Sequence, residues 1–229
     1  QNPAYVRSAS AEEFARLQQA ADGLIKLVDV APEQPGNLDF IHDVSHDVRV
    51  SIAHTCTDYD TACAAFDAGA RHMTHLYNAM PSLHHRNPGP IAAGAERNDV
   101  TAEIIADGVH IHPAMVRLAF TLFGDDRMIL ISDSLRACGL GDGEYELGGQ
   151  QFFVHGNRAT IANGSLAGSV SDVMACLRTA VLTMGIPLTS AVKAASVNPA
   201  RALGLASERG AIAPGYVADA VVLDRELNI

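Results

Sequence analysis

The sequence predicts an α/β fold built on a parallel sheet, and three observations support this prediction. Short apolar runs that end in a polar residue recur through residues 24–134. Helix-like patterns lie between these runs, and glycines stand near their C-terminal ends, where a left-handed cap is favoured. The alternation of strand and helix at intervals of about 23 to 31 residues is typical of βα units, whose strands pair in parallel.

Each expected element follows from its local pattern. Strands are expected at five apolar runs: 24–33, 48–55, 70–78, 101–110 and 127–134. The intervening patterns predict helices at 58–70 and 113–124. A closed parallel barrel has eight strands. Either the chain is part of a (β/α)8 TIM-type barrel, with about five of its strands present, or the fold is not a closed barrel.

The pattern changes after residue 134. Residues 143–164 contain Gly-Gly and Gly-Asn turn signals between alternating runs, which predicts an inserted β-hairpin. Helical periodicity returns at three segments: 168–183, 187–196 and 198–205. The last residues, 206–229, combine a Pro-Gly turn with an apolar run, which predicts a strand. We thus expect residues 1–205 to be the C-terminal part of the barrel and 206–229 a second domain.

Composition excludes several classes of protein. The 229 residues are 48% hydrophobic and 18% charged, and no apolar run approaches the roughly 20 residues that cross a bilayer. The formal net charge of −10 argues against a nucleic-acid partner, because phosphate backbones are held by clustered Lys and Arg. The four cysteines form no CxxC pair. We expect reduced thiols in a soluble, cytoplasmic protein without a membrane partner.

Polar residues stand at the C-terminal ends of the expected strands, where a parallel barrel keeps its active site: Glu33, His54, His75, Asp107 and Asp133. His54 and His75 end adjacent strands, so they are placed to share one divalent metal. Asp133 could then take the proton of a metal-activated water. Alternatively, each histidine only caps its strand by bonding a backbone carbonyl.

Other polar residues are better explained structurally. His84 and His85 are adjacent on a loop and are expected to be solvated or to contact another subunit. Asp107 is expected to form a turn beside a glycine, and His112 to lie in a loop near the site. Cys138 has no basic partner at a fixed spacing, which argues against a nucleophilic role.

Seven motifs, in order, carry a family resemblance: AHTCTD, THLYNAM, HRNPG, IIADGVHIHP, ISDS, NGSLAGS and GAIAPGYVADAVVLD. With NPAYVR at residues 2–7, they span nearly the whole chain. The chain resembles the N-acetylglucosamine-6-phosphate deacetylases of the amidohydrolase superfamily. The closing motif alone indicates only the superfamily, whereas HLYNAM followed by Arg-x-Pro-Gly and ADGxH is much narrower.

The resemblance implies roles for single residues. His54 and His75 resemble the two metal-binding histidines, and Asp133 resembles the catalytic aspartate that deprotonates water and then protonates the departing amine. His110 resembles the histidine that contacts the substrate and helps to polarise its carbonyl. The implied cofactor is a divalent metal ion, with zinc or iron expected.

The remaining site residues implied by the resemblance bind the sugar phosphate. Asn78 and Ala79 match the stretch that holds the phosphate, and Arg86 matches an arginine that can reach a neighbouring subunit's site, which implies a homodimer. An arginine fork suits phosphate geometry. Leu166 and Ala167 fall on the loop that covers the substrate.

Departures from the family pattern also matter. The family's third metal ligand is a glutamate of an EGP-type motif upstream of NPxxVR, and this sequence begins after that point. Glu33 matches a different motif. Gln1 stands where the family often has a histidine. The resemblance also implies that residues 206–229 supply strands of a small β-sandwich. The sequence is therefore expected to lack the N-terminal part of the enzyme, including the first half of that sandwich.

The expected function is metal-dependent hydrolysis of the acetamide of N-acetyl-D-glucosamine 6-phosphate, which gives glucosamine 6-phosphate and acetate in amino-sugar catabolism. Two alternatives stay open. One is a deacetylase for the galactosamine epimer, and the other is a truncated, inactive paralogue that only binds sugar phosphate.

Overall fold

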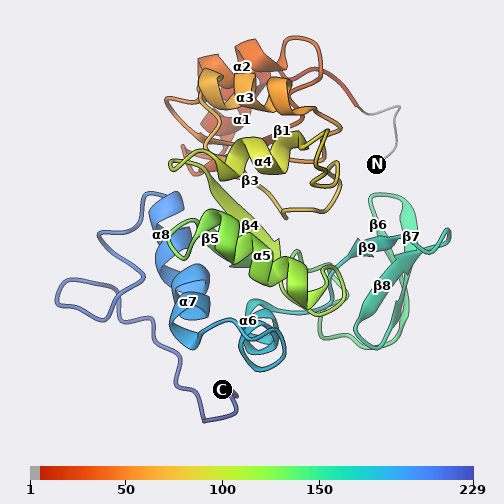
Figure 1. Cartoon of the computed structure of the whole chain (residues 1–229), viewed down its shortest axis with the longest axis vertical. Coiled ribbons are helices and arrows are strands. Elements are labelled where there is room, and N and C mark those ends of the chain that lie inside the picture. The colour runs from red at the N-terminus through yellow and green to blue at the C-terminus, as the bar shows by residue number, and fades with distance from the viewer. Residues whose placement is uncertain (1–5) are drawn as a thin grey trace. The chain divides into compact units, whose positions relative to one another are not determined.

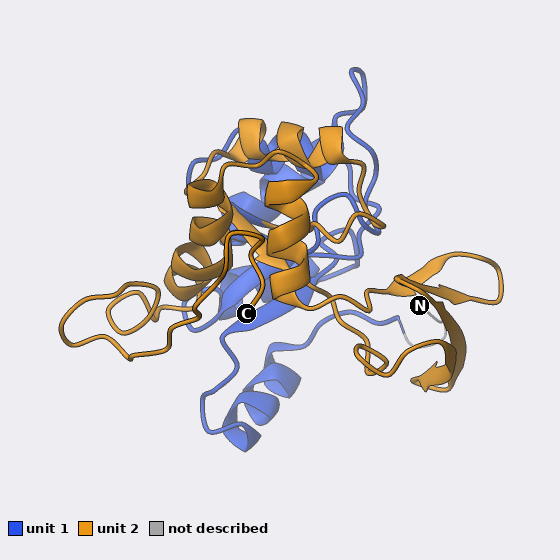
Figure 2. Cartoon of the chain, turned by 90° about the horizontal axis from the view of Figure 1, so that it is seen from below, with its two compact units in different colours: residues 1–102 blue, residues 103–229 orange. Residues whose placement is uncertain are grey.

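The computed structural model describes residues 6–229, and the chain divides into two compact units, residues 1–102 and 103–229 (Figure 2). Each unit is treated by itself below. Gln1 and most of the NPAYVR motif fall outside the described residues. Within that part of the chain, no helix combines the length and the apolar character that crossing a membrane requires.

The parallel sheet confirms the prediction of about five strands (Figure 1). Its order follows the sequence: β1 (Leu27–Val30), β2 (Arg49–Ile52), β3 (His72–Met73), β4 (Thr101–Ile105) and β5 (Met128–Ile131). The first four strands pair in parallel, with Val30 opposite Ile52 and Ile52 in turn opposite Met73. Because neighbouring strands run in parallel, their C-terminal ends meet at one edge of the sheet.

Four helices accompany the strands of the first unit: α1 (Ala11–Ala20), α2 (Asn37–Val44), α3 (Tyr59–Ala68) and α4 (Gly89–Ala95). Side-chain caps begin two of them. Ser10 Oγ accepts the Glu13 N–H at the start of α1, and Asp58 Oδ1 accepts the Thr61 N–H at the start of α3. Of these four helices, only α3 was predicted.

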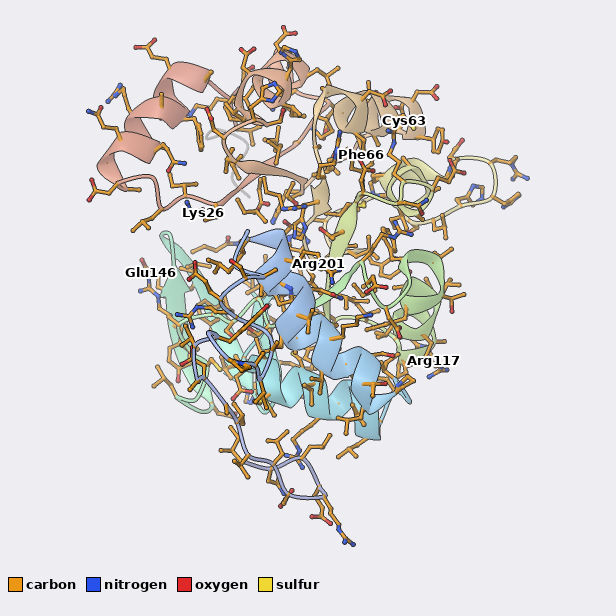
Figure 3. All side chains as sticks on the ribbon, turned by 90° about the vertical axis from the view of Figure 1, so that its left-hand side faces the viewer. Lys26, Cys63, Phe66, Arg117, Glu146 and Arg201 are labelled. Atoms are coloured by element: carbon orange, nitrogen blue, oxygen red, sulfur yellow. The ribbon has the colours of Figure 1, made fainter. Side chains whose placement is uncertain are left out.

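The core of the first unit lies between the sheet and these helices. Val50 and Ile52 of β2, Met73 of β3 and Phe66 of α3 are all buried, and Phe66 is labelled in Figure 3. Each such side chain contributes about 1.5–3 kcal/mol when it leaves water. Gly94 of α4 permits a close approach, since a Cβ at this position would collide with Met73 Sδ.

The opposite face of this sheet carries polar side chains. Thr74 Oγ1 donates to Asp29 Oδ1 at 2.7 Å. Ser51 Oγ lies 2.7 Å from the same Thr74 oxygen, so the Ser51 hydroxyl is the donor in that contact. Ser51 is fully buried although it is polar, and this chain of bonds satisfies it.

The helices of the second unit agree closely with the predicted ones. They are α5 (Pro113–Phe123), α6 (Val173–Leu182), α7 (Leu188–Val192), a π-helical turn (Lys193–Val197) and α8 (Asn198–Ala202). The buried Asn198 joins α8 to the sheet, because its Nδ2 donates to the carbonyls of Asp125 and Met128, both at 2.7 Å. Arg117 of α5, labelled in Figure 3, donates to the carbonyl of Met184 at 2.8 Å.

The predicted hairpin proves to be part of a larger antiparallel sheet (Figure 1). Its strands are β6 (Gly143–Leu147), β7 (Gln150–His155), β8 (Arg158–Ile161) and β9 (Leu166–Gly168). Gly148 and Gly149 have φ of 58° and 79°, the left-handed pair that a tight hairpin turn needs. Phe152 and Val154 of β7 are buried against Leu135 and Ala137.

The C-terminal segment differs from its prediction. Residues 206–229 contain turns and irregular backbone but no strand. Most of their apolar side chains are exposed, with Ile212 100% and Val222 84% accessible, whereas Leu227 is buried. A strand needs a neighbouring edge that takes up its N–H and C=O groups, and within residues 6–229 this segment pairs with neither sheet. The assignment of this segment to a small β-sandwich and the division at residue 205 stay predictions.

Candidate metal and substrate site

His54 and His75 converge in the first unit. They lie just beyond the ends of β2 and β3, and their Nε2 atoms are 2.8 Å apart, with ring centroids separated by 4.7 Å. His75 is buried, whereas His54 is exposed. Two neutral imidazoles at this distance need one N–H donor and one lone-pair acceptor. The strands thus bring together the two histidines that the sequence analysis paired.

The backbone at both histidines is left-handed. The φ angle is 47° at His54 and 34° at His75. Non-glycine residues adopt positive φ uncommonly, and histidine, asparagine and aspartate are enriched among those that do. The left-handed residue ends each strand and turns the chain at the edge of the sheet.

This pair fits a metal as two of its donors. Two nitrogens on one tetrahedral zinc ion are about 3.3 Å apart, given Zn–N distances of about 2.0–2.1 Å. The two Nε2 atoms, now 2.8 Å apart, would therefore need to move apart only slightly to bind one ion. His75 Nδ1 is buried and has no hydrogen-bond partner in residues 6–229. No cluster of three or more His, Cys, Asp or Glu side chains suited to a metal occurs in that range.

Glu33 holds the loop that follows His54. Its Oε2 accepts the Thr55 hydroxyl at 2.5 Å, and its Oε1 accepts the Cys56 N–H at 2.7 Å. The Thr55 N–H in turn donates to the carbonyl of Ala79 at 3.0 Å. Both carboxylate oxygens are thus occupied by the loop. Glu33 braces the chain beside His54, a role that its place at a strand end did not reveal.

The predicted phosphate residues lie on the loop after β3. The backbone N–H and the Nδ2 of Asn78 both donate to the carbonyl of His75, at 2.9 and 3.2 Å. Ala79 is exposed and has a φ of 49°. These bonds close a tight turn immediately after the buried histidine.

Arg86 is exposed farther along the same loop. Its Nη1 lies 2.6 Å from His85 Nε2, and its backbone N–H donates to His84 Nδ1 at 3.3 Å. Both of these histidines are exposed as well, and neither belongs to a metal-binding cluster within the described range. Their contacts are with Arg86, in keeping with a polar loop.

Asp133 follows β5 in the second unit and also has a left-handed backbone, with φ of 50°. Its carbonyl accepts the Ser169 N–H at 3.0 Å, and the Leu135 N–H donates to the Ser169 carbonyl at 2.8 Å. The aspartate is therefore fixed to the end of β9, the short strand that begins with Leu166 and Ala167. Its side chain is exposed.

His110 forms a buried pair with Asp107 in the loop after β4. Asp107 Oδ2 lies 2.7 Å from His110 Nδ1, and their side chains are 0% and 5% exposed. Asp107 Oδ1 accepts the N–H groups of Val109 and His110, both at 2.9 Å, so the aspartate also forms the predicted turn. Burial raises the pKa of Asp107, but the bonds from the His110 ring and the two backbone groups lower it below its ordinary value.

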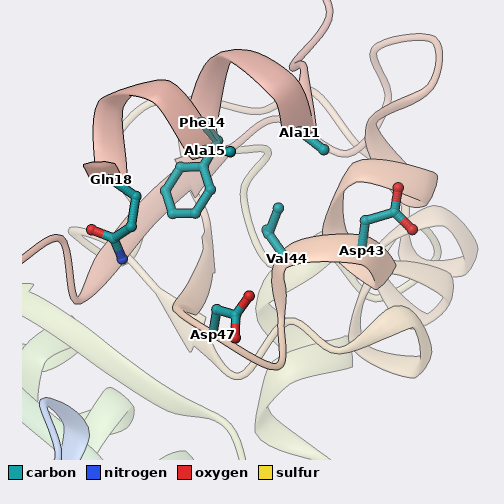
Figure 4. A pocket seen from close by; sticks show the side chains of 7 residues that line it. All are labelled: Ala11, Phe14, Ala15, Gln18, Asp43, Val44 and Asp47. Carbon is teal, nitrogen blue, oxygen red and sulfur yellow. The ribbon is translucent and has the colours of Figure 1, made fainter. Parts of the chain in front are cut away.

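The pairing of Asp107 with His110 was not predicted. Its sequence signal is the spacing of three residues in DGVH, which permits an aspartate to close a turn and meet the following ring. The pocket of Figure 4 lies elsewhere, in the first unit. It is lined by residues of α1, α2 and the turn after α2, among them Phe14, Val44 and Asp47, and includes none of the predicted site residues.

A parallel sheet with histidines and aspartates at its strand ends defines a class of barrel hydrolases, and comparison with known proteins agrees. The chain belongs to the amidohydrolase family, whose sequence model matches residues 2–228. It is 38% identical over 226 residues to the N-acetylglucosamine-6-phosphate deacetylase of Bacillus subtilis (strain 168), a match covering 98% of this chain and 57% of the relative. It is 37% identical over 228 residues to the N-acetylgalactosamine-6-phosphate deacetylase of Escherichia coli O157:H7, covering 99% and 60%.

Solved structures show the same fold. The N-acetyl-D-glucosamine-6-phosphate deacetylase D267A mutant from Mycobacterium smegmatis, in complex with N-acetyl-D-glucosamine-6-phosphate, matches with a TM-score of 0.94 and 39% identity. That match covers 99% of this chain and 61% of the solved chain. This chain thus spans less than two thirds of the length of these relatives, and its sheet is part of an amidohydrolase barrel.

Proposed function

We propose that the chain forms part of a metal-dependent deacetylase that hydrolyses N-acetyl-D-glucosamine 6-phosphate to glucosamine 6-phosphate and acetate. The observation that carries this proposal is the approach of His54 Nε2 to His75 Nε2 at 2.8 Å. Two strand-end imidazoles that face each other suit a shared cation better than separate backbone caps. The deacetylase relatives in bacteria and mammals support the choice of reaction.

In this proposal His54 and His75 hold a divalent ion, zinc or iron. The bound ion would lower the pKa of water and polarise the acetamide carbonyl. Asp133 takes the proton from the attacking water and returns it to the amine as the C–N bond breaks. One carboxylate can serve as base and then as acid. The proton that it takes from water converts it to a carboxylic acid, which can then donate that proton to the amine.

The sugar phosphate is proposed to be held by the loop after β3. Arg86 is exposed and cationic, so it is available to pair with the phosphate, and Asn78 with Ala79 forms the turn beside it. His110 contacts the sugar, and Leu166 with Ala167 covers it. The motif matches support these roles. We further propose a cytoplasmic homodimer in which Arg86 reaches a neighbouring subunit's site.

A deacetylase for N-acetylgalactosamine 6-phosphate is the second candidate. A relative with that name is 37% identical to this chain, nearly the same identity as the glucosamine relative shows. The same metal and phosphate residues would serve both epimers. The preferred epimer therefore depends on contacts to the sugar ring.

The test is to purify the enzyme of which this chain forms part, measure its bound metal, and follow acetate release from both N-acetylhexosamine 6-phosphates. We expect bound zinc or iron, turnover of the glucosamine compound, and loss of metal when His54 and His75 are both replaced by Gln. Faster turnover of the galactosamine compound would favour the second candidate. Tight sugar-phosphate binding without metal or turnover would contradict an enzyme and indicate an inactive binding protein.

A further inference from the structure

The buried Asp107–His110 pair fixes which ring nitrogen of His110 carries a proton. Asp107 contributes both oxygens to the contact region: Oδ1 accepts two backbone N–H groups and Oδ2 faces the ring at 2.7 Å. An ionised carboxylate can only accept hydrogen bonds. The nitrogen that faces it, Nδ1, must therefore be the protonated one.

The carboxylate is ionised at neutral pH. Its pKa lies below the ordinary value because its hydrogen bonds outweigh the opposing effect of burial. The side chains of the pair are 0% and 5% exposed, so water does not compete for this bond. Fixing a histidine tautomer through its second nitrogen is a recognised role of buried carboxylates.

We propose that Asp107 is a positioning residue that holds His110 as the Nδ1–H tautomer, so that neutral His110 presents Nε2 as a hydrogen-bond acceptor. This changes the role expected from the sequence. A neutral ring with a lone pair on Nε2 cannot donate a hydrogen bond to the acetamide carbonyl. It accepts one instead, and its partner is a hydroxyl or N–H group of the sugar.

The tautomer follows from the pair alone, whereas the sugar partner rests on the proposed function. The two parts are therefore tested separately. The first test uses nitrogen-15 NMR of the histidine rings in the full chain at about pH 8.5, above the ordinary imidazole pKa of about 6.5. The His110→Gln variant identifies the His110 signals among the ten histidines.

The unaltered chain decides the tautomer. We expect the Nδ1 of His110 to carry a proton, and a bare Nδ1 with a protonated Nε2 would overturn the proposal. In Asp107→Asn, Oδ1 can still accept the two backbone N–H groups while the amide nitrogen replaces Oδ2 and donates to the ring. This variant should shift the proton from Nδ1 to Nε2.

Asp142 provides a matched control in the same unit. Its Oδ1 accepts the Gly156 N–H at 2.7 Å and its Oδ2 lies 3.2 Å from His155 Nδ1, so it repeats the arrangement of Asp107. This pair is exposed, with side-chain accessibilities of 90% for the histidine and 59% for the aspartate. Asp142→Asn should leave the His110 signals unchanged.

The second test concerns the reaction. Asp107→Asn should lower kcat/KM for acetate release by about 10- to 100-fold, by analogy with the loss of a carboxylate that orients a metal-ligating histidine. Asp142→Asn should stay within about twofold of the unaltered enzyme. Normal kcat/KM in an Asp107→Asn variant whose tautomer has shifted would overturn the role in catalysis while leaving the tautomer and the deacetylase function standing.

Discussion

Asp133 combines a chemical role with an uncommon backbone conformation. Its φ of 50° lies in the left-handed region, which asparagine and aspartate tolerate better than most residues. Asp133→Asn should therefore keep the fold and the metal. Because an amide cannot take a proton from water, kcat should fall by about 10²- to 10⁴-fold.

This change is measured as steady-state acetate release, with circular dichroism and metal content as checks on folding. Asp142→Asn, an exposed aspartate of the same unit, is the control and should have no effect on kcat. A kcat close to normal in Asp133→Asn would show that another group is the base.

Arg86 is expected to select phosphorylated substrates. Its exposed guanidinium contacts His85 in the structure and is available for an anion. Arg86→Ala should raise KM for N-acetylglucosamine 6-phosphate by about 10- to 100-fold, which corresponds to the 1.5–3 kcal/mol of hydrogen bonds to a charged group. KM for unphosphorylated N-acetylglucosamine should hardly change.

The assay compares KM for the two sugars in Arg86→Ala and in Arg16→Ala, which removes another exposed arginine of the same unit. The second variant should resemble the unaltered chain. An equal rise of KM for both sugars in Arg86→Ala would exclude a phosphate role.

At the scale of elements, Gly69 determines how α3 ends against α2. Its φ is 127°, and a Cβ built on it would collide with the side chain of Ser45, the residue that caps α2. Gly69→Ala should thus lower the free energy of unfolding by about 1–3 kcal/mol beyond the cost of the backbone conformation.

Gly36 is the control that separates the cost of the steric collision from the cost of the left-handed backbone. Its φ is also positive, at 78°, but a Cβ there would meet no atom within 4 Å. Gly36→Ala should cost about 1–2 kcal/mol from its left-handed backbone alone. Urea unfolding of both variants measures the difference, and equal costs would show that Ser45 moves aside without strain.

Across the whole molecule, acid should weaken folding. The pKa is lowered in five aspartates: Asp58, Asp107, Asp126, Asp142 and Asp224. In the four exposed ones hydrogen bonds are the main cause, and in Asp107 they outweigh burial. Because the folded pKa lies below the unfolded one, this stabilisation is complete above about pH 4 and is lost as the pH falls through the folded values.

The urea midpoint at pH 7 and at about pH 3 tests this expectation, and it should be lower in acid. Asp107→Asn should reduce the difference between the two midpoints more than Asp142→Asn does, since solvent screens the exposed pair. A midpoint that does not depend on pH would contradict the linkage.

The sequence predicted the features of the whole molecule that depend on periodic patterns. All five strands and their polar ends were located because a buried parallel strand needs an apolar run and its site residues follow directly. The approach of His54 to His75 followed from the same rule. The strand expected over 206–229 did not form because pairing depends on a partner edge that a local pattern does not specify.

Loop contacts were beyond such prediction. Glu33 and Asp107 were recognised as strand-end residues, but their partners depend on how each loop turns. Glu33 reaches across 23 positions to Cys56, and no periodicity encodes such a contact. The hydrogen bonds that hold the loops of the site can therefore be identified only in the folded chain.

The left-handed backbones at His54, His75 and Asp133 restrict what can replace these residues, independently of chemistry. Valine, isoleucine and threonine are disfavoured there by their branched Cβ, whereas asparagine and glycine fit. A library of variants selected only for soluble expression would therefore already be biased at these three positions. The restricted substitutions at these positions would therefore mark the site residues without any assay of substrate.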